Sequence, residues 1–265
     1  MNVLDKYRIL DDKVFEEFKK YFPKTTNSTF NKEFPNTSIL ISMFDTSATF
    51  IKNSIFDCCE TDNNYAVKIL FRSLIEHFFR FKYIFMNWAK TKSDSFAKNY
   101  MEYGKAKETL EMFKSQVSEQ QLFEPKFKIK IWDIFLKDNP RFGNKTRKEI
   151  DDELKKLSFN SIMKFLNKEL YRDNDETSTF FGKLIKEYSK SSSYVHGGMR
   201  SYKEMGENNN TDYRDNEYNR ISGLTCQMSN SIKLFTLIMY VQTDKALFNK
   251  HYQKIDKIIT KINKV

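Results

Sequence analysis

The sequence predicts an all-α protein, and three observations lead to this prediction. Only 7 Gly and 4 Pro occur among 265 residues, which leaves little material for the tight turns of a sandwich, a propeller or a nucleotide-binding α/β sheet. Nearly every long segment repeats its apolar residues with a helical period, and none alternates as a strand does. The 25 Phe and 14 Tyr can fill a large core, which excludes disorder despite a mean hydropathy of −0.65. We therefore expect one domain over 1–265, a single helical bundle of about nine helices.

The first half of the chain holds four expected helices. They lie at 11–22, 37–59, 65–88 and about 93–117. Pro23 ends the first of them, the Thr-Asp-Asn-Asn run at 61–64 caps the third, and Asp94 caps the fourth. In the second helix, the apolar residues that we expect to face inward are Ile39, Met43, Phe44, Phe50, Ile51 and Ile55.

The remaining helices follow at shorter intervals. They lie at about 126–136, 147–157, 159–170, 176–196, 218–242 and 245–263. Two prolines, at positions 125 and 140, mark an insertion rather than a domain boundary, and we place a helical insertion at 118–175. The Gly-Gly pair at 197–198 stops the long helix before it. The Asn-rich segment 204–215 is polar, and we expect it to be a loop.

The charge balance is compatible with a polyanionic partner but has a second explanation. The chain carries 45 Lys and Arg against 35 Asp and Glu, a formal charge of +10. Such a surplus is typical of proteins that bind nucleic acid or an anionic membrane surface. An A+T-rich genome would also produce it, since Lys, Asn, Ile, Phe and Tyr are all abundant. Lys moreover outnumbers Arg, the residue that phosphate recognition with fixed geometry favours. Both explanations stay open.

Cysteines, apolar stretches and missing motifs exclude further classes. Three Cys, two of them adjacent, cannot form a disulfide framework and indicate a reducing compartment. The N-terminus mixes acidic and basic residues, unlike a signal peptide, and the apolar stretch 234–241 is far shorter than the ~20 residues of a membrane span. We expect a cytoplasmic protein without membrane contact. Because no glycine-rich phosphate loop, Cys-x-x-Cys or His-Glu-x-x-His occurs, we expect neither a cofactor nor a metal.

The helix expected at 65–88 carries charged residues on a largely apolar surface. Lys68, Arg72, Glu76 and Arg80 follow at four-residue spacing, so that Arg72 and Glu76 can form an ion pair. Burying such a pair is costly unless each charge finds further partners. The pair is then either a structural contact that fixes helix register, or part of a polar pocket. In such a pocket Arg72 would bind a phosphate or carboxylate, and Glu76 would orient a neighbour.

The helix expected at 176–196 carries a polar line at its C-terminal end. Ser189, Ser192, Ser193 and His196 are spaced so that they lie on one side of the helix. Small hydroxyls allow another helix or a ligand to approach closely. His196 is either a capping residue or a group that transfers a proton, since a helix C-terminus favours an imidazolium.

These two motifs together resemble a known superfamily. R-S-L-I-E, with Arg72 and Glu76, is followed about 120 residues later by S-x-x-x-H-G, with Ser192 and His196. The combination is similar to uncharacterised prokaryotic helical proteins that resemble the HEPN superfamily, and the likeness covers 37–241. It implies a HEPN-like core with inserted helices. It also implies a place among defence ribonucleases, toxins and abortive-infection proteins.

HEPN nucleases carry an Arg, four to six further residues and then a His, and this motif implies metal-independent RNA cleavage. The His moves a proton at the 2′-hydroxyl or the leaving oxygen, the Arg steadies the phosphorane, and a dimer often completes the site. Arg72 and His77 match the spelling, but residues five apart in an unbroken helix diverge by ~140°. Upstream of His196, Lys190 stands where the family has Arg. We therefore predict a combined site, in which Arg72 faces His196 across the bundle.

The residues of this combined site fall into two groups. The expected catalytic residues are His196, Arg72, Glu76 and Ser192. Weaker substrate contacts are expected from Lys190, His77, Arg80 and Tyr194.

Two functions of different classes follow from this site. The first is a HEPN-like effector of prokaryotic antiviral defence, a metal-independent ribonuclease or RNA-acting toxin. The second is a non-catalytic helical binding or regulatory subunit of a defence or toxin–antitoxin complex, which Lys190 in place of Arg favours. A weaker third hypothesis is a nucleotide-binding pocket centred on Arg72 that senses a small anionic signal. The expected partners are RNA and either a second copy of the chain or another defence protein.

Overall fold

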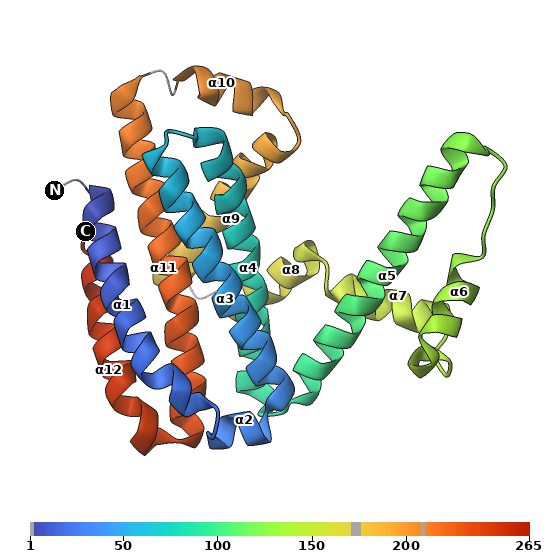
Figure 1. Ribbon diagram of the computed structural model, residues 1–265, viewed down its shortest axis with the longest axis horizontal. Coiled ribbons are helices and arrows are strands. Elements are labelled where there is room, and N and C mark those ends of the chain that lie inside the picture. Colours follow the sequence, from blue (N-terminus) through green and yellow to red (C-terminus); the bar gives the residue numbers. More distant parts are fainter. Residues whose placement is uncertain (1–2, 171–175, 208–209) are drawn as a thin grey trace.

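A computed structural model describes residues 3–170, 176–207 and 210–265, and these ranges contain helices and no strand (Figure 1). The prediction of an all-α fold is confirmed. Twelve α-helices and one 3₁₀-helix occur in the described ranges, more than expected, because α2 and α10 have no counterpart among the predicted helices. None of the described helices is long and apolar enough to span a membrane. In chain order the elements are α1 (Val3–Thr25), α2 (Thr29–Glu33), α3 (Pro35–Glu60), α4 (Asn64–Thr91), α5 (Ser95–Phe123), α6 (Ile131–Asp138), η1 (Pro140–Phe142), α7 (Arg147–Lys156), α8 (Phe159–Leu170), α9 (Glu176–Val195), α10 (Met199–Glu207), α11 (Thr211–Thr243) and α12 (Lys245–Ile262).

The main body is a bundle in which α11 packs against α1, α3, α4 and α12 (Figure 1). On its other side α4 packs against α8 and α9. Buried ion pairs join these helices. Lys52 of α3 pairs with Asp11 of α1, and Lys233 Nζ of α11 lies 2.8 Å from Asp45 Oδ1 of α3. Since an unpaired buried charge is costly, these pairs favour one alignment of the helices.

An arm formed by α5, α6, η1 and α7 projects from this bundle (Figure 1). The arm has its own small core, whose buried residues are Tyr103, Ala106, Leu110, Phe135, Phe142, Ile150 and Leu157. After the arm, α8 returns to the bundle and buries Ile162 and Leu166 in the main core. The predicted insertion, 118–175, comprises the outer part of the arm and α8, and its residues 171–175 lie outside the described ranges.

Several predicted helix boundaries are wrong, among them the start of α1, which begins at Val3 and not at residue 11. The segment 204–215 is not a loop, because α10 continues to Glu207 and α11 begins at Thr211. Asn210 caps α11, since its side-chain oxygen accepts a hydrogen bond from the Tyr213 amide at 3.1 Å. Asn is favoured at helix caps as well as in loops, and Asn210 acts here as the N-cap of a helix. Pro23 does not end α1 either, and the helix continues to Thr25.

The predicted inward face of α3 is also partly wrong. Ile39, Met43 and Phe50 are 55%, 59% and 66% exposed, respectively. Apolar residues surround most of α3, so periodicity alone does not decide which side is buried. Packing against α4 and α11 buries a different side, with Leu40 and Ile41 in the core.

Candidate functional site

The residues predicted from two distant motifs meet where α4 packs against α9. Arg72 Nε donates to Ser192 Oγ at 3.1 Å, and Arg72 Nη2 donates to the Tyr188 hydroxyl at 2.8 Å. Arg72 Nη2 also lies 3.1 Å from Glu76 Oε1, which completes the expected i,i+4 ion pair. The structure therefore brings together Arg72, Glu76 and Ser192, three of the four residues predicted as catalytic. We call these residues and Tyr188 the Arg72 cluster.

Tyr188 is a member of the Arg72 cluster to which the sequence assigned no polar role. Its hydroxyl donates to Glu76 Oε1 at 3.0 Å, and its ring lies 4.7 Å from the Arg72 guanidinium carbon. On the other side, the ring packs against Phe159 at a centroid distance of 4.3 Å. Burial and the hydrogen bond to Glu76 raise the pKa of Tyr188, which favours the protonated phenol that makes this bond. The spacing in the sequence could have indicated that Tyr188 lies on the same side of the helix as Ser192, because it precedes Ser192 by one helical turn.

The fourth predicted residue, His196, lies at the exposed end of α9. The Gly198 amide donates to the Ser193 carbonyl oxygen at 2.8 Å, and Gly197 adopts a φ of +61°. Together these features form a Schellman motif, in which His196 is the C-cap residue. Its amide donates to the Ser192 carbonyl oxygen at 3.3 Å. The His196 ring makes no hydrogen bond or ion pair with another described residue, so the capping role belongs to its backbone.

Side-chain burial separates His196 from the Arg72 cluster. The side chains of Arg72 and Glu76 are 20% and 25% exposed, whereas His196 is exposed to solvent. Arg72 has five N–H groups, and its interactions with described residues use Nε and Nη2. The Nη1 donors therefore have no partner among the described residues and could bind an anion that approaches from solvent.

Lys190 and Tyr194, two of the weaker predicted contacts, have partners of their own. Lys190 Nζ lies 3.3 Å from Glu187 Oε1. Tyr194 is completely buried, and its hydroxyl donates to Glu204 Oε2 of α10 at 3.1 Å. Neither side chain belongs to the Arg72 cluster.

His77 and Arg80, the other two weaker contacts, line a cleft of about 460 Å³ between α3, α4 and α5. His77 Nδ1 bonds the Ser73 carbonyl oxygen at 2.8 Å. Because α4 continues unbroken past both residues, Arg72 contacts α9 while His77 lines this cleft. The divergence expected for residues five apart is therefore found. We call this cavity the His77 cleft.

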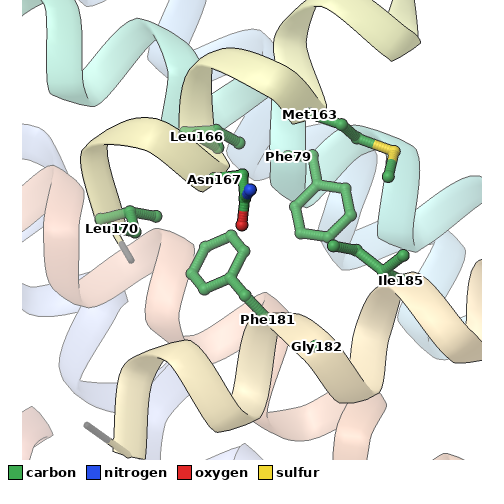
Figure 2. A pocket seen from close by; sticks show the side chains of 8 residues that line it. All are labelled: Phe79, Met163, Leu166, Asn167, Leu170, Phe181, Gly182 and Ile185. Carbon is green, nitrogen blue, oxygen red and sulfur yellow. The ribbon is translucent and has the colours of Figure 1, made fainter. Parts of the chain in front are cut away.

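A second cavity, of about 220 Å³, lies between α8 and α9 over Phe79 of α4 (Figure 2). Apolar side chains such as Met163 and Phe181 line it, and Asn167 supplies its polar side chain. Among the described residues, no titratable group lines it. Within the described ranges, moreover, no three His, Cys, Asp or Glu side chains gather as a metal site would require.

Comparison with known proteins gives one match. The model of a family described as a family of unknown function, DUF5677, matches residues 38–213, more than half of the chain. The matched range contains the Arg72 cluster, His196 and the His77 cleft. No curated protein and no solved structure matches the chain.

Proposed function

We propose that this chain, which belongs to the DUF5677 family of unknown function, is a HEPN-like effector of prokaryotic antiviral defence that cleaves RNA without a metal ion. The observation that supports this proposal most is the 3.1 Å contact between Arg72 and Ser192. It holds an arginine of α4 against α9, one helical turn before the exposed His196. Arg72, and a histidine one helical turn beyond its partner Ser192, are the two groups that we propose for RNA cleavage without a metal.

In this proposal His196 and Arg72 have different roles in the cleavage reaction. His196 accepts the proton of a ribose 2′-hydroxyl, whose oxygen then attacks the adjacent phosphorus. The free Nη1 donors of Arg72 stabilise the charge that develops on the phosphorane oxygens. The 5′ oxygen leaves with a proton from solvent water, and His196 returns its own proton to solvent, so that the products carry a 2′,3′-cyclic phosphate and a 5′-hydroxyl. Glu76 and Tyr188 position the guanidinium and do not touch the RNA.

The proposal also includes a substrate, a cellular location and partners. The substrate is RNA, and the surplus of 10 positive charges favours its approach. We place the protein in the cytoplasm, as a homodimer or in a complex with another defence protein. A second copy would add a second exposed His196 to the site.

The test is incubation of the purified full chain with total RNA at neutral pH, with and without EDTA. Cleavage should persist in EDTA and fall by about a hundredfold or more in His196→Ala. The matched control is Val195→Ala, which removes an exposed neighbour on the same turn and should cleave normally. Failure of the wild type to cleave any RNA, or full activity of His196→Ala, would contradict the proposal.

The second candidate is a non-catalytic binding or regulatory subunit. It is favoured by the pairing of cations that a nuclease would direct at phosphate, since Glu76 neutralises Arg72 and Glu187 neutralises Lys190. Light scattering after size exclusion and a pull-down from the native host distinguish the two candidates. A stable complex with another protein, together with unchanged toxicity of Arg72→Ala, would favour the subunit.

A further inference from the structure

The His77 cleft contains an arginine that no carboxylate neutralises. Arg80 Nη1 donates to the Tyr100 hydroxyl at 3.4 Å and to the Leu157 carbonyl oxygen at 3.3 Å, both long for N–H···O bonds. No described carboxylate forms an ion pair with Arg80, although the side chain is half-buried. A guanidinium that is partly removed from water and lacks an anion keeps its strongest donors available for one.

Further groups in the cleft complement this charge. His77 lines it too, and because a carbonyl can only accept, Nδ1 carries the proton of the bond to Ser73. Nε2 is therefore the ring nitrogen left for a ligand. Phe44 and Met43 form an apolar wall, while Glu108 and the ion pair of Lys107 with Glu111, at 3.8 Å, lie on the α5 side. The cleft thus combines the cation of Arg80, an imidazole, an apolar wall and, on α5, one ion pair and the carboxylate of Glu108.

Gly104 lies in the middle of α5 and lines the same cleft. Glycine is unfavourable in a helix interior compared with alanine. Packing does not require it here, because a Cβ at this position would meet no atom within 4 Å. The missing side chain instead leaves the cleft wider.

We propose that the His77 cleft binds a nucleoside monophosphate. Arg80 binds the phosphate, His77 Nε2 accepts a hydrogen bond from a ribose hydroxyl, Phe44 and Met43 pack against the base, and an exocyclic N–H group of the base donates to Glu108 of α5. The volume of about 460 Å³ lies within the range of small-ligand sites. The inference goes beyond the proposed function, because the Arg72 cluster lies against α9 and the cleft lies between α3 and α5.

The experiment is calorimetry and thermal denaturation of the full chain with each of the four 5′-nucleoside monophosphates. At least one should bind and raise the melting temperature, and the matching nucleoside and inorganic phosphate should bind at least about tenfold more weakly. Arg80→Gln should weaken binding by about tenfold or more. Gly104→Phe should abolish binding by filling the cleft, while Gly104→Ala should retain it.

The experiments can distinguish failure of this proposal from failure of the ribonuclease proposal. Arg72→Gln should lose RNA cleavage but bind the monophosphate normally, since Arg72 does not line the cleft. Binding that Arg80→Gln and Gly104→Phe leave unchanged would overturn the inference. Absence of binding by all four monophosphates would overturn it too, whether or not an oligonucleotide binds, and would not bear on RNA cleavage.

Discussion

Arg72 and Arg80 lie eight residues apart on α4, and the protein surrounds them differently. Arg72 has a carboxylate at 3.1 Å, a phenol at 2.8 Å and a hydroxyl at 3.1 Å. Among the described residues, Arg80 has a phenol at 3.4 Å and a carbonyl at 3.3 Å as its hydrogen-bond partners. The same contrast recurs among buried lysines, because Lys233 pairs with Asp45, whereas Lys82 contacts aromatic rings. A buried cation that pairs with a carboxylate helps to fix the packing of the helices. A buried cation without such a partner either lowers the stability of the fold or is available to bind a ligand.

The largest effect expected from this contrast is at Lys82. Its Nζ lies 3.6 Å from the Phe235 ring centroid, no described carboxylate pairs with it, and burial lowers its pKa to about 8. Lys82→Met removes the cost of burying the charge, and the lost cation–π contact offsets part of the gain. We expect the free energy of unfolding at pH 7 to rise by about 2 kcal/mol, measured by urea denaturation.

The pH dependence gives a second measurement on the same variant. An unfolded lysine keeps its proton up to a pKa of about 10.4, so between pH 8 and that value the unfolded state binds more protons. The contribution of Lys82 to stability therefore rises with pH in this window, and below pH 8 its penalty is complete. Lys82→Met should abolish this rise. Parallel stability curves for both proteins would contradict the prediction. The matched control, Lys233→Met, should destabilise, because Asp45 then stays buried without a partner.

A smaller effect is expected within the Arg72 cluster. Glu76→Gln keeps an acceptor for the Tyr188 hydroxyl but removes the charge that faces Arg72. Because both side chains of the ion pair are partly exposed, we expect a loss of only about 1 kcal/mol in the free energy of unfolding, measured in urea. Glu16→Gln is the matched control, since the Glu16–Lys19 pair lies at the surface and should contribute nothing measurable. Equal losses in the two variants would mean that the cluster is no stronger than a surface pair.

The sequence predicted the Arg72 cluster better than the His77 cleft, and geometry explains why. The four-residue spacing of Arg72 and Glu76 and the position of Ser192 depend on the helical repeat alone, so their helix faces could be predicted. The same spacing grouped Arg80 with Arg72 in one stripe. Over eight residues, however, an α-helix rotates that stripe by ~80°, enough to bring Arg80 against a different neighbour.

Features that depend on tertiary packing could not be predicted. The exposure of Phe50 follows from which side of α3 meets α4 and α11, and the apolar residues around α3 allow several choices. The projection of the arm depends on the direction in which α5 leaves the bundle, which helical periodicity does not contain. Tyr188 was missed for a related reason, because its hydroxyl gains a role only beside Arg72 and Glu76 in the folded protein.

The smallest effect, and the sharpest test of the comparison, is expected at Arg80. Arg80→Gln breaks two long hydrogen bonds and leaves no described carboxylate without its partner, so the free energy of unfolding should change by less than about 0.5 kcal/mol in urea without ligand. A loss of about 2 kcal/mol would instead mean that the bond to Leu157 holds the end of α7 against α4, and that Arg80 is structural. A near-zero effect on stability combined with lost monophosphate binding would distinguish Arg80, which binds the ligand without stabilising the fold, from Arg72, whose ion pair with Glu76 contributes to stability.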